Sequence, residues 1–482
     1  MKSKNSKNNS RRTFLKKGIL ASSIMIVPRH VLGGQGFLAP SDQLNIAGIG
    51  VGGKGRSDII NASVNGRERV VALCDIDPQG KHGVLDTIKD FPKANFYDDF
   101  RRLFDTEKNL DAITVSTPDH THGIIAMEAM SRGIHVYIQK PLTHNIREAR
   151  LLTEKARVNK IVSQMGNQGA SNPAQLKVQE WIDSGLIGKV SEVKVWTNRP
   201  VWPQGIPKPP SDPQNKPDQL AWDLWLGPAK KSPFSSSLHP FNWRGWWEYG
   251  TGALGDMGCH IIDIPFRALG LHYPTAVECS VGSVYTKMWT PEYIPEGCPP
   301  SSSVTINFDS TEKNDIPMVM TWTDGGIRPA RPDLIPITED IGEPGGGNGV
   351  MMIGEYGVIT TGVYGYNPKL FRKGEPTLTF DQPKQTLPDF GHQQQWIDAI
   401  KSGFNSDLHR SLTSSFDYSG PLTETVLMGN IAIRSYLLRK GTKSMEYYGR
   451  KKLLWDGDNM QITNLKDANQ FVGRDYREGW EL

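Results

Sequence analysis

The stretch LNIAGIGVGGKGRSDII, residues 44–60, decides the fold. In it a short apolar run leads into a cluster of glycines, and a helix-like stretch follows. Gly50, Gly52 and Gly55 have the spacing G-x-G-x-x-G, and Gly53 lies within it. In a dinucleotide-binding turn such glycines allow the tight turn, the approach of backbone amides to a pyrophosphate, and close helix packing. The stretch therefore predicts a strand, a phosphate-binding turn and a helix.

A second apolar run, RVVALCDID at residues 69–77, supports this prediction. It carries Asp75 near its end, 20 residues after Gly55, where an acidic side chain binds the ribose hydroxyls of a dinucleotide. Because a carboxylate there repels a 2′-phosphate, we expect NAD in preference to NADP. The basic side chain of Lys54 nearby leaves NADP open as an alternative.

Strand-like and helix-like stretches alternate through the next hundred residues. Apolar runs end in STPDHTH (residues 116–122) and in IHVYIQKPL (residues 134–142), and a helix at 145–158 and a strand at 160–169 follow. This alternation predicts a doubly wound parallel sheet. Ligands of such sheets bind at the carboxyl ends of the strands, and the side chains that fall there are those of Thr117, Pro118, His122 and Lys140.

Length and composition suggest a globular protein of two domains. A chain of 482 residues is too long for one core, and we expect a cofactor-binding domain at 43–168 and a second domain at 169–482. A hydrophobic share of 37% with a charged share of 22% excludes a fibrous or disordered chain. Much of the net charge of +4 comes from the first 17 residues, so the remainder gives no case for nucleic-acid binding.

Residues 1–42 predict an export signal and a linker. SRRTFLKKG at 10–18 contains a twin arginine, and a short apolar stretch follows at 19–27. We therefore expect the twin-arginine export machinery as a partner and a periplasmic location, which suits an enzyme that loads its cofactor before export. No small-x-small cleavage site stands out, so a membrane-tethered N-terminus stays open.

The histidines and cysteines do not predict a metal site. His120 and His122 lie two residues apart without an evident third ligand, and turn or capping roles are expected for them. One disulfide could form in an oxidising compartment, but no pairing follows from the spacing of the four cysteines, Cys74, Cys259, Cys279 and Cys298.

A proline-rich and tryptophan-rich insertion occupies residues 198–247, approximately. Seven of the 13 tryptophans and ten of the 33 prolines lie between residues 196 and 247, which prevents regular helix or strand. We expect an ordered excursion over the catalytic cleft, where Trp243 and Arg244 contact a sugar. The alternative, that any one tryptophan only attaches a long loop to the body, stays open.

Together these motifs resemble the Gfo/Idh/MocA family of oxidoreductases. The residues that carry the resemblance are GVGGKG at 50–55, Asp75, STPDHTH at 116–122, QKP at 139–141 and GTGALGDMGCHIID at 250–263. The family usually has Glu where this chain has Gln139. Any electrostatic support that Glu gives the neighbouring lysine is therefore expected to be reduced here.

The resemblance implies a C-terminal α/β domain around a large, mainly antiparallel sheet, with a homo-oligomer formed through that sheet. The sequence agrees, because it has β-like runs and late helices. The expected strands lie at 192–198, 275–286, 303–308, 318–323 and 354–363, and the expected helices at 393–402 and 422–440.

The resemblance also implies the catalytic residues, Lys140, Asp256 and His260. Oxidation of a secondary alcohol needs a base for the hydroxyl proton, a hydride acceptor and a cation that stabilises the oxygen. We expect His260 as the base, Asp256 as the group that orients it, and Lys140 as the cation. The expected substrate-binding residues are Asn167, Trp243, Arg244 and His260; the expected cofactor-binding residues are Gly50, Gly52, Gly53, Gly55, Asp75, Thr117, Pro118, His122 and Lys140.

The expected function is oxidation of a secondary hydroxyl of a sugar, glycoside or polyol by tightly bound NAD. One alternative is an NAD-dependent glycoside hydrolase or lyase that works by transient oxidation and elimination. A lesser alternative is a non-catalytic protein that retains NAD. Which sugar and which carbon react cannot be deduced from these motifs.

Overall fold

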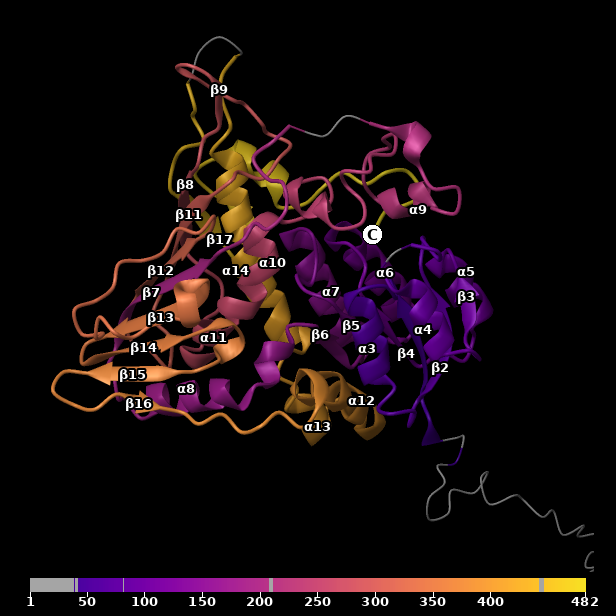
Figure 1. Ribbon diagram of the computed structural model, residues 1–482, viewed down its shortest axis with the longest axis horizontal. Coiled ribbons are helices and arrows are strands. Elements are labelled where there is room, and N and C mark those ends of the chain that lie inside the picture. The colour runs from indigo at the N-terminus through magenta and orange to yellow at the C-terminus, as the bar shows by residue number, and fades with distance from the viewer. Residues whose placement is uncertain (1–38, 40–41, 81, 208–210, 442–445) are drawn as a thin grey trace, which may run out of the picture.

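The structure is a computed structural model that describes residues 39, 42–80, 82–207, 211–441 and 446–482. The predicted twin-arginine motif lies outside these residues. Figure 1 shows two sheets side by side, a parallel one in the indigo and purple part of the chain and a large one in the orange part. In the described part of the chain, no helix has the length and apolar character to cross a membrane.

The first domain is a six-stranded parallel sheet with the strand order β3-β2-β1-β4-β5-β6. Its inner strands are apolar and buried on both faces, as expected for a parallel sheet covered by helices. The strands are β1 (Asn45–Ile49), β2 (Arg69–Cys74), β3 (Asn95–Tyr97), β4 (Ala112–Val115), β5 (His135–Ile138) and β6 (Ser163–Met165). The helices are α3 (Lys54–Ala62), α4 (Val84–Asp90), α5 (Phe100–Thr106), α6 (Asp119–Ser131) and α7 (Ile146–Val158).

The strand order reverses between β1 and β4, which are neighbours in the sheet. Chain connections leave such a switch point in opposite directions and open a crevice at the carboxyl ends of the strands. The predicted glycine turn follows β1 and the predicted STPDHTH stretch follows β4. The fold therefore brings these two motifs to one crevice, as the sequence predicts.

The second domain contains a ten-stranded sheet with the order β16-β15-β14-β13-β7-β12-β11-β8-β17-β18. Only the pair β7–β12 is parallel among its described pairings, so the sheet is mixed and mostly antiparallel. The strands are β7 (Val190–Thr197), β8 (Ala276–Val281), β11 (Ser302–Phe308), β12 (Met318–Thr323), β13 (Asn348–Gly354), β14 (Gly357–Thr361), β15 (Lys369–Arg372), β16 (Leu378–Thr379), β17 (Leu453–Asp456) and β18 (Gln461–Ile462).

Two strand expectations differ from the structure. The run predicted at 275–286 ends earlier, and a separate hairpin of β9 (Tyr285–Lys287) and β10 (Thr290–Pro291) follows it. The glycine-rich stretch at 343–349, which resembles a loop, leads directly into β13. A Cβ added to Gly349 would lie 2.2 Å from the Trp196 ring, so glycine is needed there because the ring packs against the strand.

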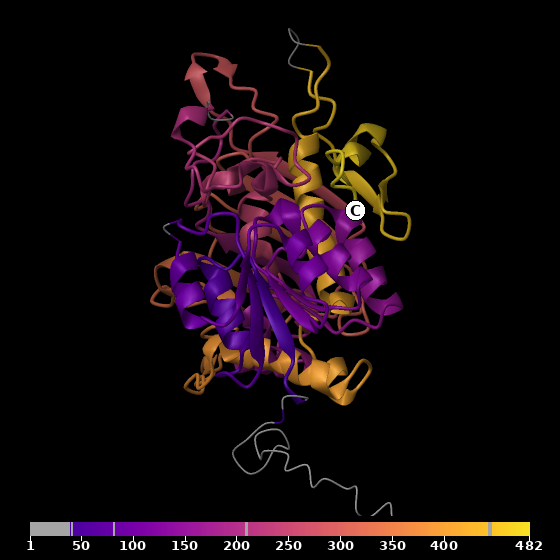
Figure 2. The ribbon, with the colours of Figure 1, turned by 90° about the vertical axis from the view of Figure 1, so that its right-hand side faces the viewer.

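Long helices join the two domains. Helix α14 (Phe416–Ser435) is buried nearly all round and packs against both α7 and α10 (Gly252–Ile261). Helix α12 (His392–Ser402) comes from the segment assigned to the second domain, yet Trp396 and Ile397 share a core with Ile46 of β1. Figure 2 shows α12, in orange, beneath the parallel sheet, and α14, in gold, upright behind it. The remaining helices are α8 (Pro173–Asp183), α9 (Trp222–Leu226), α11 (Asp263–Ala268) and α13 (Asp407–Arg410).

Candidate active site

The glycine turn after β1 has the geometry that the sequence predicts. Gly50 has a φ of +73°, and a Cβ on it would lie 2.9 Å from the backbone of Ser116. A Cβ on Gly55 would lie 1.8 Å from the Gly50 carbonyl oxygen. Side chains are therefore excluded at both positions, and the turn presents its backbone amides at the start of α3.

Asp75 supports this turn from the end of β2. Its carboxylate accepts hydrogen bonds from the backbone amides of Val51, at 2.9 Å, and Asp77, at 3.0 Å. Burial raises the pKa of Asp75, against the lowering effect of these amide donors. The acidic group that the sequence predicts for the ribose thus lies beside the glycine turn.

A cleft of about 360 Å³ runs along the strand ends. It has the concave shape and size of a small-molecule site. The predicted cofactor and substrate residues that line it are Gly50, Gly52, Gly53, Asp75, Thr117, Pro118, Trp243 and Arg244. The open glycine turn, its amides and the neighbouring Asp75 carboxylate together fit a dinucleotide.

The insertion covers one end of this cleft. Trp222 and Trp225 stack with ring centroids 4.4 Å apart, and they form a separate core with Trp243 and Trp246 that packs on Ile76 of the first domain. In Figure 1, α9 of the insertion and the C-terminus of the chain lie above α5 and α6. The insertion is therefore an ordered roof over the cleft, as expected.

The C-terminal segment completes the roof. Trp480 lines the cleft, lies 6.1 Å from Phe100 between ring centroids, and carries the Arg101 guanidinium over its ring at 3.8 Å. We call the part of the cleft between Asp75, Trp225 and Trp480 the Asp75 end. No local motif could have indicated Trp480, because its partners lie in the first domain.

His239 of the insertion is a second lining residue that the sequence interpretation missed. Its Nε2 lies 3.2 Å from the Asp77 carboxylate, and its ring meets those of His82 and Trp225 edge-on. Burial lowers the pKa of His239, while Asp77 counteracts this effect. The sequence shows Asp77 two residues after Asp75. It does not show that His239 of the insertion contacts Asp77, because that contact depends on the tertiary fold.

His122 lies behind the cleft and does not line it. Its Nδ1 lies 2.9 Å from the Pro141 carbonyl oxygen and its Nε2 2.8 Å from that of Thr117. The ring thus joins the loops that follow β4 and β5. The sequence predicts that His122 binds the cofactor directly. In the structure, His122 instead contacts the two loops that follow β4 and β5.

His120 is also buried, and both of its ring nitrogens face carbonyl oxygens of other segments. Nδ1 lies 3.1 Å from the Tyr249 oxygen and Nε2 2.9 Å from that of Trp225, so His120 attaches the roof to α6. Across the described ranges, no three side chains of His, Cys, Asp or Glu gather as a metal site would require. The four cysteines are free thiols, three of them buried.

Lys140 and Asp256 form a buried ion pair next to this cleft. The Lys140 Nζ donates to the Asp256 Oδ1 at 2.9 Å and to its backbone oxygen at 2.7 Å, with side chains 15% and 13% exposed. Arg244, which lines the cleft, lies 3.5 Å from Asp256, and Arg199 lies 3.8 Å from it. We call this group the Lys140 end.

The charges at the Lys140 end keep Asp256 ionised. Burial would raise the pKa of Asp256, but Lys140 and Arg244 outweigh this effect and lower it to about 2. Within the described residues, the hydrogen bond that this carboxylate accepts comes from Lys140. The expected direct orientation of His260 by Asp256 is therefore replaced by a lysine–aspartate pair, because the cations lie closer.

His260 lies one turn beyond Asp256 on α10. It is 4% exposed, and its ring meets Tyr364 edge-on at 4.8 Å between centroids. Burial lowers the pKa of His260 well below its usual value, and the Lys140 charge adds to this. The imidazole is thus neutral near pH 7 and can accept a proton. In the described part of the chain its Nδ1 has no hydrogen-bond partner.

Asn167 follows β6 and is fully buried. Among the described residues, neither its amide nitrogen nor its amide oxygen has a hydrogen-bond partner. Buried amides are normally paired, so this side chain is suited to a polar ligand, although it does not line the cleft; its role in substrate binding stays a prediction. A larger, open hollow of about 680 Å³ between α8, α12 and α13 contains none of the predicted site residues.

The comparisons with known proteins agree with this geometry. Residues 44–167 match the model of an oxidoreductase family with an NAD-binding Rossmann fold, and residues 174–282 match the model of its C-terminal alpha/beta domain. Over these two stretches the chain is similar to the Gfo/Idh/MocA oxidoreductase family. Its first domain is accordingly an NAD-binding Rossmann domain.

Three curated relatives align with parts of this chain. A scyllo-inositol 2-dehydrogenase (NAD(+)) of Bacillus subtilis is 31% identical over 91 residues, 19% of this chain and 27% of the relative. Levoglucosan dehydrogenase of Pseudarthrobacter phenanthrenivorans is 24% identical over 202 residues, 42% of either chain. A glycosyl hydrolase family 109 protein of Shewanella pealeana is 27% identical over 206 residues, 38% of this chain and 44% of the relative. The chain thus spans less than half of each relative.

The likeness of folds extends further along the chain. The solved structure of levoglucosan dehydrogenase in complex with NADH superposes on 81% of this chain and 97% of its own, with a TM-score of 0.54 and 16% sequence identity. This likeness shows that the two domains share the fold of that structure.

Proposed function

We propose that the protein oxidises a secondary hydroxyl of a sugar, glycoside or polyol with NAD as the hydride acceptor. The observation that carries the proposal is the Lys140–Asp256 pair with neutral His260 beside the NAD cleft, linked to it by Arg244. The names of the relatives, inositol and levoglucosan dehydrogenases, support the same substrate class.

Each residue of this group has a separate task in the reaction. Lys140 holds the reacting hydroxyl and stabilises the negative charge that develops on its oxygen. His260, neutral and buried, receives the hydroxyl proton, as a general base must. Asp256 stays ionised and holds the lysine in place. Bound NAD supplies the site that accepts the hydride from carbon.

We also propose that NAD is retained between turnovers. Roofing of the Asp75 end by the insertion and by Trp480 supports this proposal, because a bound dinucleotide could leave only after these segments move. The test is to denature the purified protein and to quantify released nicotinamide cofactor by mass spectrometry. Near-stoichiometric NAD(H) is expected, and protein free of cofactor would contradict the proposal.

The relative from glycosyl hydrolase family 109 favours a second candidate, redox-neutral glycoside cleavage. Oxidation at C3 would give a ketone, elimination would expel the glycosidic substituent, water would add, and the hydride would return to C3. A screen of glycosides without an added electron acceptor separates the candidates. Free sugar supports cleavage, whereas turnover only with an acceptor supports the dehydrogenase. No turnover with either, despite retained NAD, would support a non-catalytic binding protein.

We further propose export by the twin-arginine route and a homo-oligomer formed through the large sheet. The motif at Arg11 and Arg12 supports export. On β11, polar Ser303, Thr305 and Asn307 alternate with buried apolar residues, so the outer face of the sheet suits a hydrated interface. Cell fractionation after Arg11→Lys and Arg12→Lys tests export, and light scattering tests the oligomeric state.

A further inference from the structure

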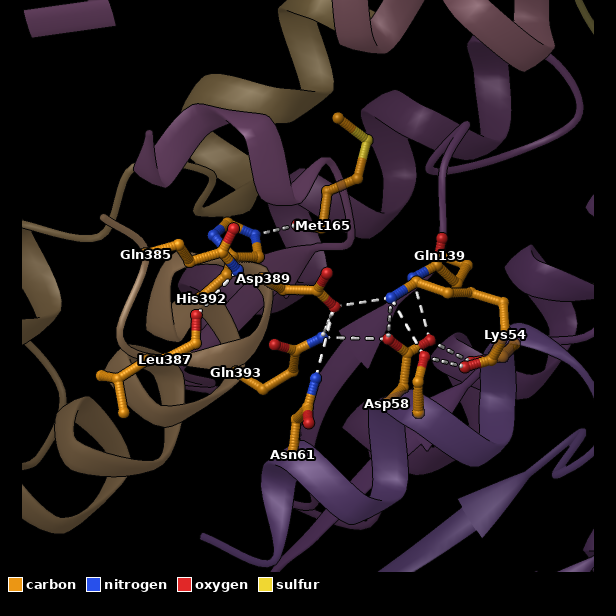
Figure 3. A network of polar contacts seen from close by, with 12 residues as sticks. Lys54, Asp58, Asn61, Gln139, Met165, Gln385, Leu387, Asp389, His392 and Gln393 are labelled. Atoms are coloured by element: carbon orange, nitrogen blue, oxygen red, sulfur yellow. Dashed lines mark hydrogen bonds and ion pairs between the residues drawn. The ribbon is translucent and has the colours of Figure 1, made fainter. Parts of the chain in front are cut away.

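One buried carboxylate connects the loops around the active site. Asp58 on α3 is fully buried. Its Oδ2 accepts hydrogen bonds from the Ser116 hydroxyl at 2.8 Å and the Gln139 amide at 2.9 Å. Its Oδ1 accepts from the Gln393 amide and lies beside the Lys54 ammonium, both at 3.0 Å. Figure 3 shows Lys54, Gln139 and Gln393 converging on Asp58.

These partners come from four separate segments. Lys54 begins the helix that follows the glycine turn, Ser116 follows β4, Gln139 follows β5, and Gln393 lies in the first turn of α12. Gln139 directly precedes Lys140. Asp58 therefore ties the backbone that carries the proposed catalytic lysine to the cofactor turn.

The Gln139 side chain has no freedom to choose another partner. A Cβ added to Gly166 would lie 2.5 Å from the Gln139 amide nitrogen, so the amide is held between the β6 end and Asp58. The Gly166 amide in turn donates to the Ile138 oxygen at 2.7 Å. The position of residue 139, and with it that of Lys140, is set by this packing and by the bond to Asp58.

The charges around Asp58 disfavour another ionised carboxylate at this site. Lys54 also pairs with Asp389 at 2.7 Å, so two carboxylates already share one ammonium. The nearby Tyr137 phenol is neutral, because burial and the charges of Asp58 and Asp389 raise its pKa well above its usual value. A glutamate at position 139 would bring a third negative charge into contact with Asp58.

We propose that Asp58 is the positioning residue for Lys140, and that it supplies the negative charge to which the neutral Gln139 side chain is bound. The negative charge lies on Asp58 of α3, one hydrogen bond away from residue 139. Through this bond Asp58 fixes the Gln139 side chain, and with it the backbone of the adjacent Lys140. This inference rests on the proposed function of Lys140.

A charge-swap series tests the proposal. Gln139→Glu adds a second carboxylate to the contact, and Asp58→Asn removes the first. The double variant again has one carboxylate and one amide, with the carboxylate now at position 139 and the amide at position 58. With retained NAD, Gln139→Glu should lower kcat about a hundredfold above neutral pH, since misplacement of a catalytic group by about 1 Å has that effect. The double variant should recover most of this loss.

The pH profile distinguishes positioning from a merely structural role. In Gln139→Glu the carboxylate contact raises the pKa of the introduced carboxyl. Below that pKa the introduced carboxyl is protonated and donates to Asp58 as the amide does, so kcat should return toward the wild-type value as pH falls. The wild type and the double variant should not show this recovery.

Two readouts need no substrate. Because the folded-state pKa of the introduced carboxyl is raised, the penalty is absent at acid pH and grows as pH rises through that pKa. The thermal midpoint of Gln139→Glu should therefore match the wild type near pH 5 and fall below it near pH 8. The rate at which an amine-acylating reagent labels Lys140, measured by peptide mass spectrometry, should change severalfold in both single variants and return in the double variant.

Asp389→Asn is the matched control, because Asp389 bonds Lys54 and Gln393 but not Gln139. It should show neither the pH-dependent kcat nor the altered labelling. The proposal is overturned if Gln139→Glu behaves as the wild type, if the double variant regains stability but not kcat and labelling, or if the control reproduces the effect. If no sugar is oxidised even by the wild type, the proposed function fails, while stability and labelling still decide the role of Asp58.

Discussion

The Asp75 end of the cleft and the Lys140 end beside it are held together by different kinds of contact. At the Asp75 end, aromatic rings from the insertion, from α5 and from the C-terminal segment pack on one another. At the Lys140 end, Asp256 is surrounded by the cations Lys140, Arg244 and Arg199. The first end is held by buried apolar area, and the second by charge.

This difference suggests a division of labour within the cleft. Apolar packing is non-directional and adds up over many atoms, which suits retention of a ligand. Charged groups act strongly on a developing charge at short range, which suits chemistry. Changes at the Lys140 end should therefore affect turnover, and changes at the Asp75 end should affect cofactor release.

The largest effect is expected from Lys140→Met. Loss of the cation should lower kcat by about 10² to 10³, while the amount of retained NAD stays unchanged. Steady-state kinetics together with cofactor analysis of the same preparation checks this. Unchanged turnover with NAD still bound would show that Lys140 has no catalytic role. It would also contradict the assignment of turnover to the Lys140 end.

An intermediate effect is expected from Asp256→Asn. Because the folded-state pKa of Asp256 is about 2, below its usual value, the ionised carboxylate stabilises the fold above about pH 4. The variant should have a free energy of unfolding lower by about 2 kcal/mol near neutral pH. Denaturant unfolding at a series of pH values should show this difference shrinking as pH falls toward 2, and a constant difference would contradict the assigned pairing.

The smallest effect is expected from Trp480→Ala at the Asp75 end. Loss of its contacts with Phe100 and Arg101 should speed NAD release about tenfold and leave kcat nearly unchanged. Fluorescence of released NADH measures this rate. Trp455→Ala is the matched control, because Trp455 is equally buried but lies on β17; it should destabilise the fold without changing release.

Residues set by short motifs could be predicted from the sequence. Gly50 could be predicted from the spacing of the glycines in the turn after β1, and Asp75 from its place at the end of the next strand, β2. The position of Lys140 follows from the rule that ligands bind at the carboxyl ends of strands. Asp256 and His260 are implied by the resemblance that the GALGDMGCHIID stretch carries, and the structure places both on α10. In each of these cases the deciding information lies within about one element of the chain.

Residues set by distant contacts could not be predicted. The Asp58–Gln393 bond joins positions 335 residues apart, and Trp480 reaches Phe100 from the other end of the chain. Strand β13 was missed because its glycines, which favour turns, are there to accommodate Trp196. Such pairings are decided by the tertiary fold, which local pattern does not contain.

The late position of Trp480 in the chain has a consequence for biosynthesis. The Rossmann domain is complete at residue 167, but the segment that carries Trp480 leaves the ribosome some three hundred residues later, roughly 15 to 60 s at ordinary translation rates. A dinucleotide captured by the nascent domain would meet an open cleft throughout that time. The proposed retention of NAD therefore begins only when translation has passed residue 480.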